Sequence, residues 1–226
     1  QLPPDSAGSP GQPPGQSCPA SVAQLPPDAA RPPDAARPPA GGAPAWSLGA
    51  SAAGLAWLES GRRSAGGRLA EPGLEALARV AMSAYRRPDP PLDLGKRAAL
   101  GGASAMMDIS DGLAKDAARL GRASGLRLVI DPSAPALARA IADWAPLAAE
   151  LGRDPRQWVL GGGEDHAFLA TFPAGGGLPD GWHGIGQVVA PGEGGPGAAF
   201  ADGTEVQGWD HFERPGQGQG RNLIEN

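Results

Sequence analysis

The sequence contains a single cysteine, Cys18, and few aromatic residues, which make up 5% of the chain. A lone cysteine forms no intrachain disulfide, so nothing indicates an oxidising compartment. No apolar run approaches the roughly 20 residues that a membrane-spanning helix needs, and the N-terminus shows no charged segment followed by an apolar one, as a secretory signal would. We therefore expect a cytoplasmic protein with no membrane partner.

Basic residues are also in short supply. Lys and Arg total 19 against 24 Asp and Glu, which gives a formal net charge of -5 and a pI of about 5.2. A nucleic-acid-binding domain usually carries a basic patch and a basic pI. We therefore expect no nucleic-acid partner.

Several catalytic motifs are absent from the sequence. There is no Gly-x-Ser-x-Gly elbow, no phosphate loop ending in Gly-Lys-Ser/Thr and no dinucleotide-binding glycine fingerprint after a strand. His166, His183 and His211 form no i, i+4 pair, and no cysteines support a zinc site. The sequence thus argues against serine hydrolases of the elbow type, P-loop enzymes, Rossmann-type dehydrogenases and zinc enzymes.

Residues 1–45 differ in composition from the rest of the chain. They hold 13 of the 26 prolines, and Gln-Leu-Pro-Pro-Asp at residues 1–5 returns at residues 24–28. Such a segment buries too little apolar surface to offset the entropy lost on ordering. We predict a disordered segment with polyproline II character, serving as a linker or as translated sequence unrelated to the fold. Docking into a partner's aromatic groove is the functional alternative.

From Trp46 onward, helical and strand-like patterns alternate, which predicts an α/β or α+β fold. We expect one folded domain over residues 46–212 and a flexible tail over residues 213–226. Helices are predicted at residues 51–58, 73–85, 111–123 and 134–151, with a helical turn at 154–159; strands are predicted at 103–108, 126–130, 166–172 and 182–189, with a final hairpin at 198–206. Three prolines, Pro88, Pro90 and Pro91, are expected to end the second helix.

Residues 108–112 (Asp-Ile-Ser-Asp-Gly) lie where a predicted strand turns into a helix. Asp108, Asp111 and the Ser110 hydroxyl fall beside a helix N-terminus, which favours anions. Because Mg2+ prefers one or two carboxylates together with phosphate oxygens and water, a metal and phosphate site is one interpretation. The structural alternative is that Ser110 caps the helix and Asp111 is a charge of its first turn.

Two further segments can carry chemistry. In residues 161–166 (Gly-Gly-Gly-Glu-Asp-His), the glycines permit close approach to a ligand, and the pair Glu164 and Asp165 can bind a ligand or a metal; the alternative is a glycine-rich connection with solvated charges. In residues 208–212 (Gly-Trp-Asp-His-Phe), Trp209 can stack on a heterocycle or simply pin the end of the chain.

In this order and spacing, the segments resemble the thiamine-monophosphate kinase family. The matching motifs are Asp-Ile-Ser-Asp-Gly-Leu at residues 108–113, Gly-Gly-Glu-Asp at 162–165, Ile-Gly-Gln-Val at 185–188 and Gly-Trp-Asp-His-Phe at 208–212. The resemblance covers residues 46–212. It implies the fold of the C-terminal domain of the aminoimidazole ribonucleotide synthetase-like superfamily.

The resemblance also implies a reaction, the ATP- and Mg2+-dependent phosphorylation of thiamine monophosphate to thiamine diphosphate. It implies that Asp108 and Asp111 are Mg2+ ligands, that Ser110 contacts ATP, that Glu164 contacts thiamine monophosphate and that Trp209 is the aromatic residue beside the substrate ring. No residue is assigned as catalytic, because phosphoryl transfer depends mainly on positioning and on neutralising phosphate charge.

The chain departs from the family pattern in its N-terminal part. The family has an N-terminal domain with a Gly-Asp-Asp metal site, which also forms the homodimer and much of the ATP site; here the Pro-rich segment stands in its place. Ala50 occupies a position where family members often have Asp. We therefore expect the chain to retain the substrate side of the site and not to phosphorylate thiamine monophosphate by itself.

Two other hypotheses remain. In the first, the chain is a non-catalytic, decayed homologue that binds thiamine phosphates or a partner. In the second, it belongs to another branch of the same superfamily, such as aminoimidazole ribonucleotide synthetase or a hydrogenase maturation protein. The motif at residues 208–212 argues against the second of these.

Overall fold

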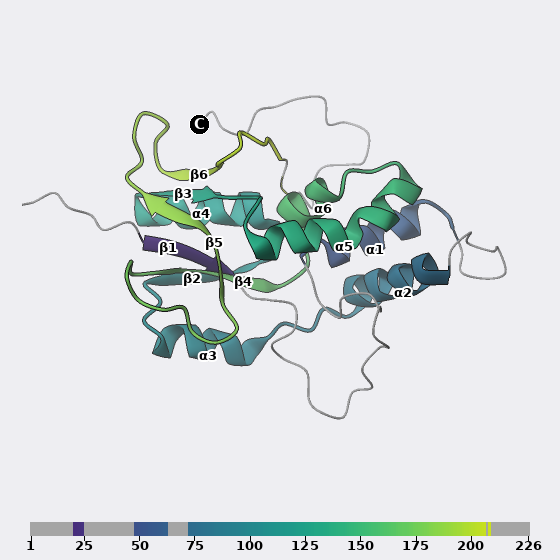
Figure 1. Ribbon diagram of the computed structural model, residues 1–226, viewed down its shortest axis with the longest axis horizontal. Coiled ribbons are helices and arrows are strands. Elements are labelled where there is room, and N and C mark those ends of the chain that lie inside the picture. The colour runs from purple at the N-terminus through teal and green to yellow at the C-terminus, as the bar shows by residue number, and fades with distance from the viewer. Residues whose placement is uncertain (1–19, 25–47, 63–71, 207, 209–226) are drawn as a thin grey trace, which may run out of the picture.

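The computed structural model describes residues 20–24, 48–62, 72–206 and 208, and it confirms the predicted mixture of helices and strands (Figure 1). The strands are β1 (Ala20–Gln24), β2 (Ala105–Ile109), β3 (Arg127–Ile130), β4 (Ala167–Phe172), β5 (His183–Val189) and β6 (Gly197–Phe200). The helices are α1 (Ala50–Glu59), α2 (Pro72–Arg86), α3 (Leu92–Leu100), α4 (Leu113–Ser124), α5 (Pro135–Leu151) and α6 (Pro155–Gly161).

The six strands of the described residues form one sheet in the order β2-β4-β1-β5-β3-β6. Neighbouring strands are antiparallel, except β3 and β6, which run parallel. The register of β2 and β4 pairs Ile109 with Ala167, so β4 begins where β2 ends. The turn after β2 and the loop before β4 therefore leave the sheet at the same end, and these are the two segments that carry the acidic motifs.

Strand β1, at residues 20–24, falls within the segment predicted to be disordered, and the structure places those five residues in the sheet. It lies in the interior of the sheet and pairs with β4 on one side and β5 on the other. Composition does not reveal such a strand, because a short strand between two partners is held by backbone hydrogen bonds that almost any residue except proline can form. The other residues of this segment, Cys18 among them, lie outside the described residues.

Apolar side chains bury both faces of the sheet. On one face, Leu169 of β4 and Ile185 of β5 join a large cluster with α1, α4, α5 and α6. On the other face, Ala170 and Phe172 of β4 pack against Leu94 of α3, which lies across the sheet from α4 and α5 (Figure 1). The sequence of a strand buried on both faces is a nearly continuous apolar run, and the sequence of β4 has this pattern.

Two predictions about elements differ from the structure. Helix α2 ends at Arg86, close to the prolines as predicted, but α3 begins at Leu92 directly after Pro91, and the sequence reading missed this helix. Proline disrupts a helix interior but is tolerated at a helix start. The predicted hairpin at residues 198–206 is wrong, because β6 is a single strand that pairs in parallel with β3 and is followed by residues in no regular element.

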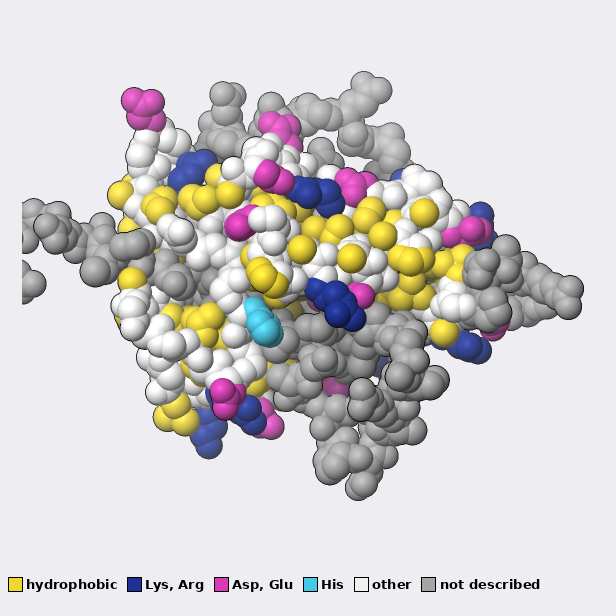
Figure 2. Space-filling view, viewed as in Figure 1, with side chains coloured by type: hydrophobic (Ala, Val, Ile, Leu, Met, Phe, Trp, Pro, Cys, Tyr) yellow, Lys and Arg dark blue, Asp and Glu magenta, His cyan; other side chains and the backbone are white. Residues whose placement is uncertain are grey.

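The helical layer also fixes the start of α1. The indole N–H of Trp144 in α5 donates a hydrogen bond to the Leu48 carbonyl (3.0 Å), and the Trp144 side chain is fully buried. Within the described residues, every helix is too short or too polar to cross a membrane. Over the face seen in Figure 2, acidic and basic side chains are interspersed, and apolar side chains gather where α5 lies.

Candidate functional site

The first two acidic motifs lie side by side. The backbone N–H of Glu164 donates to the Ser110 carbonyl (2.8 Å), and that of His166 donates to the Ile109 carbonyl (3.0 Å). These bonds continue the pairing of β2 with β4 beyond the end of the sheet. Residues 108–112 and 161–166, some fifty positions apart in the chain, therefore form one connected backbone unit.

Glycines allow this close approach. A Cβ built on Gly112, whose φ is 101°, would lie 2.4 Å from the Gly161 carbonyl oxygen. A Cβ built on Gly162 would lie 2.3 Å from the Trp158 carbonyl oxygen and 2.6 Å from the Cβ of Ala52. Any larger residue would have to displace backbone at either position. At these two positions the glycines serve the packing of α1, α4 and α6 rather than close approach to a ligand.

Asp165 is directed toward the N-terminus of α1. Its carboxylate accepts the backbone N–H of Gly49 (2.5 Å) and that of Ser51 (2.9 Å). The Ser51 hydroxyl donates to the Glu164 carbonyl (2.8 Å). Because helix N-termini carry unsatisfied N–H groups and favour negative charge, Asp165 anchors the loop to α1. Of the acidic pair considered from the sequence, Glu164 is the member whose carboxylate can meet a ligand.

The buried Asp165 carboxyl predicts a pH-dependent stability. Burial raises its pKa to about 7, against the lowering effect of the Ser51 and Gly49 N–H groups. The folded chain therefore holds a proton that the unfolded chain releases near pH 4, so the stability from this group falls as pH rises from about 4 to about 7. We expect the free energy of unfolding to drop by about 2–3 kcal/mol between pH 5 and pH 8 because of Asp165.

Urea unfolding at pH 5 and pH 8 measures this drop. Asp165→Asn cannot ionise, so the variant should lose the part of the pH dependence that Asp165 causes. If the wild type and the variant lose the same free energy between the two pH values, Asp165 does not titrate as expected.

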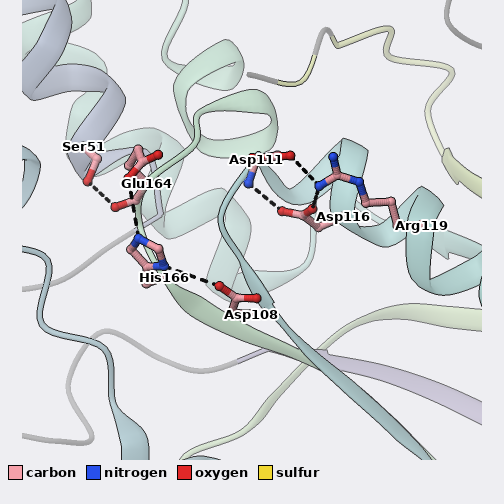
Figure 3. A network of polar contacts seen from close by, with 7 residues as sticks. All are labelled: Ser51, Asp108, Asp111, Asp116, Arg119, Glu164 and His166. Atoms are coloured by element: carbon pink, nitrogen blue, oxygen red, sulfur yellow. Dashed lines mark hydrogen bonds and ion pairs between the residues drawn. The ribbon is translucent and has the colours of Figure 1, made fainter. Parts of the chain in front are cut away.

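His166 lies between two carboxylates of the site (Figure 3). Its Nδ1 is 3.4 Å from Oδ2 of Asp108, and its Nε2 is 3.5 Å from Oε2 of Glu164. All three side chains are partly exposed: 49% for Asp108, 32% for His166 and 36% for Glu164. Asp108 and Glu164 are predicted site residues, whereas His166 is not, although it directly follows Gly-Gly-Glu-Asp in the sequence.

Asp111 is turned toward α4, away from Asp108 (Figure 3). Its Oδ2 lies 2.5 Å from Nη1 of Arg119 and 3.8 Å from Nζ of Lys115. The same Nη1 donates to the fully buried Asp116 (2.7 Å), whose other oxygen accepts the Asp111 backbone N–H (2.8 Å). Burial raises the pKa of the Asp116 carboxyl, and the Asp111 N–H and Arg119 oppose this rise. In the sequence, Asp116 and Arg119 look like ordinary charges of an amphipathic helix.

The structure corrects the capping role considered for Ser110. Helix α4 begins at Leu113, its N-cap is Gly112, and no side chain caps it. The backbone N–H of Asp111 is instead satisfied by Asp116, one turn into the helix. Ser110 is half-buried at the junction of the two motifs. The structural alternative for residues 108–112 therefore does not hold as stated.

The two aspartates expected to hold Mg2+, Asp108 and Asp111, differ in exposure and in partners. Within them, no group of three or more His, Cys, Asp or Glu side chains is arranged to hold a metal ion. Asp108 presents a half-exposed carboxylate, whereas the Asp111 carboxylate is 16% exposed and paired with two cations. Asp111 would have to leave Arg119 to reach a metal beside Asp108. Of the two aspartates, Asp108 is therefore the one that presents its carboxylate to solvent in this structure.

Trp209 and the rest of the third motif after Gly208 lie outside the described residues. Gly208 itself lies against the start of α4, because a Cβ built on it would be 2.5 Å from the Cβ of Lys115 and 3.2 Å from the Asp111 carbonyl oxygen. Gly208, the first residue of the third motif, therefore lies against the helical turn that follows the first motif.

The curated relatives of this chain include thiamine-monophosphate kinases from several organisms. No protein-family model matches the chain. The thiamine-monophosphate kinase of Mycobacterium tuberculosis (strain ATCC 25618 / H37Rv) is 41% identical over 180 residues, which cover 77% of this chain and 51% of the relative. The thiamine-monophosphate kinase of Aquifex aeolicus is 35% identical over 125 residues, covering 49% of this chain and 34% of the relative. The chain thus spans about half the length of the M. tuberculosis relative.

Solved structures confirm the fold that the resemblance implied. AaThiL complexed with AMPPCP and TMP has a TM-score of 0.62 and 27% identity, covering 88% of this chain and 53% of that chain. Thiamine monophosphate kinase from Aquifex aeolicus has a TM-score of 0.58 and 25% identity, covering 83% and 51%. The enzyme from Stenotrophomonas maltophilia K279a, with a TM-score of 0.55 and 21% identity over 81% of this chain and 50% of that one, supports the fold alone.

Proposed function

We propose that this chain, a member of the thiamine-monophosphate kinase family, takes part in the ATP-dependent transfer of a phosphoryl group to thiamine monophosphate, which yields thiamine diphosphate. The observation that carries the proposal is the union of residues 108–112 and 161–166 in one site that presents the partly exposed carboxylates of Asp108 and Glu164. The 41% identity over 180 residues with the M. tuberculosis kinase supports the same assignment.

Glu164 is the proposed contact to thiamine monophosphate. Thiamine carries a positively charged thiazolium ring and an aminopyrimidine with N–H donors, and an ionised carboxylate accepts strong hydrogen bonds and balances positive charge. Trp209 is proposed as the aromatic face for the thiazolium, through a cation–π contact. The position of Gly208 against the first turn of α4 supports placing this part of the chain near the site.

The opposite side of the site is proposed for ATP and Mg2+. Asp108 and Asp111 would hold the ion, and Ser110 would contact ATP; when bound, Mg2+ would neutralise phosphate charge. Release of Asp111 would leave Arg119 attached to the buried Asp116, with its guanidinium beside the site. Arginine suits phosphate oxygens because it offers several fixed N–H donors.

Binding without catalysis is a second proposal for this chain. The pairing of Asp111 with Arg119 and Lys115 favours it, because a carboxylate already neutralised by cations is a weaker metal ligand. A binding-only chain would bind thiamine monophosphate, and its binding of ATP with Mg2+ would not depend on Asp108 or Asp111. The kinase proposal requires that dependence.

Isothermal titration calorimetry of the 226-residue chain with thiamine monophosphate tests the substrate side. We expect Glu164→Gln to weaken binding about tenfold or more, because the substitution removes the negative charge that meets a cationic ligand. Glu193→Gln, on an exposed loop, is the matched control and should bind like the wild type. Binding by Glu164→Gln at wild-type strength, or no binding by the wild type, would contradict the proposal.

The same titration with ATP in the presence and absence of Mg2+ tests the metal side. Asp108→Asn should reduce the gain in ATP affinity that Mg2+ provides. The control is Asp180→Asn, which changes an exposed aspartate outside both motifs and should leave that gain unchanged. An unchanged Mg2+ effect in Asp108→Asn would favour the binding-only alternative.

A further inference from the structure

His166 is placed by its backbone rather than by packing alone. Its φ is 52° and that of Glu164 is 66°, and these are the non-glycine residues with positive φ in the described part of the chain. For residues other than glycine this left-handed conformation is uncommon, and such strain persists where the surrounding structure holds it. Here the holding contacts are the bonds from Glu164 and His166 to the end of β2, and those from Asp165 to α1.

The two left-handed residues direct the Asp165 side chain away from those of Glu164 and His166. Asp165, between the two left-handed residues, is bound to the α1 terminus, while Glu164 and His166 meet each other. The imidazole then reaches Asp108 on β2 with its other nitrogen. The His166 side chain thus connects the first motif to the second, in addition to the backbone hydrogen bonds.

We propose that His166 is a positioning residue that holds the carboxylates of Asp108 and Glu164 on opposite edges of its ring and so sets the distance between the phosphate side and the thiamine side of the site. The proposal rests on the proposed function for the roles of those two carboxylates. Ionised carboxylates accept hydrogen bonds and do not donate them, so a ring nitrogen that carries a proton can donate to the carboxylate beside it. Both ring nitrogens donate at the same time only when the imidazole is protonated. Without it, the two negative groups would repel and turn toward solvent.

The contact itself can be tested without any ligand. The sequence contains only three histidines, His166, His183 and His211, so the ring nitrogens of the full chain can be followed by 15N–1H NMR after labelling histidine. Asp108→Asn and Glu164→Gln should each shift the His166 ring signals, assigned through His166→Gln, and leave those of His183 in place. Unmoved His166 signals in both variants would overturn the proposal.

The positioning role is tested by calorimetry with thiamine monophosphate. His166→Phe keeps a ring but removes both nitrogens, and we expect about tenfold weaker binding. His166→Gln restores an N–H donor and should recover part of the affinity. Phe and Gln meet the same left-handed backbone, so the difference between them reports on hydrogen bonding, and matched melting temperatures exclude general unfolding.

The outcomes separate this proposal from the proposed function. If the wild-type chain binds no thiamine monophosphate, the proposed function fails, while the NMR shifts still decide whether His166 holds the two carboxylates. If the wild type binds and His166→Phe binds equally well, the positioning role fails and the proposed function stands.

Discussion

Replacing Gly112 with alanine should lower the free energy of unfolding by about 3 kcal/mol or more. The new Cβ would lie 2.4 Å from the carbonyl oxygen of Gly161, which is backbone and cannot rotate away. Alanine must also adopt the φ of 101° that Gly112 has, a conformation unfavourable for side chains. Because this contact joins the turn after β2 to the end of α6, where the loop before β4 begins, the substitution should also abolish binding of thiamine monophosphate.

Gly102→Ala is the matched control for this substitution. Gly102 also has a positive φ, 86°, but a Cβ built there meets nothing within 4 Å. It should therefore lose only the backbone contribution, about 1–2 kcal/mol, and keep ligand binding. Urea unfolding followed by tryptophan fluorescence compares the two variants. Equal losses would show that the close approach of Gly112 to Gly161 contributes nothing beyond backbone strain.

Replacing Val22 with proline should destabilise the chain by roughly 3 kcal/mol or more. Val22 lies in the middle of β1, paired with Thr171 of β4 on one side and Gly186 of β5 on the other. Proline removes a backbone N–H and fits poorly in an interior strand. Since β4 and β5 are joined in the sheet through β1, its loss would expose the edges of both strands.

Val22→Thr controls for the change of side chain, because threonine is also β-branched and keeps its N–H. It should retain most of the stability of the wild type. Far-ultraviolet circular dichroism with thermal unfolding distinguishes the two variants. A Val22→Pro chain that melts like the wild type would mean that residues 20–24 are not needed in the sheet, as the prediction of a disordered segment implied.

Most helices and strands were predicted from the sequence because the spacing of apolar residues within each one is typical of its type. Helix α4 carries its apolar stripe through Leu113, Ala117 and Leu120, all buried as the spacing requires. Strand β4 is a short apolar run, and its burial on both faces agrees with that run. Helix α3 was missed because its first turn follows closely spaced prolines, which usually signal an end and here precede a start.

The candidate site was predicted in part. Motif order led to Asp108, Ser110, Asp111 and Glu164, and the structure brings their two segments together. It does not bring the Asp108 and Asp111 carboxylates onto one ligand, because Arg119 and Asp116 draw Asp111 toward α4. No spacing rule could reveal this, since Arg119 and Asp116 reach Asp111 only once the helix has formed.

The sequence by itself determined the family resemblance, the order of the motifs and the alternation of helices and strands, since these depend on residues near one another in the chain. The tertiary structure alone decided three other matters: that β1 completes the sheet, that Asp165 serves α1 rather than a ligand, and that His166 lies between Asp108 and Glu164. Each depends on contacts between distant segments. Their strength comes from backbone pairing, burial and charge proximity, which exist only after the chain has folded.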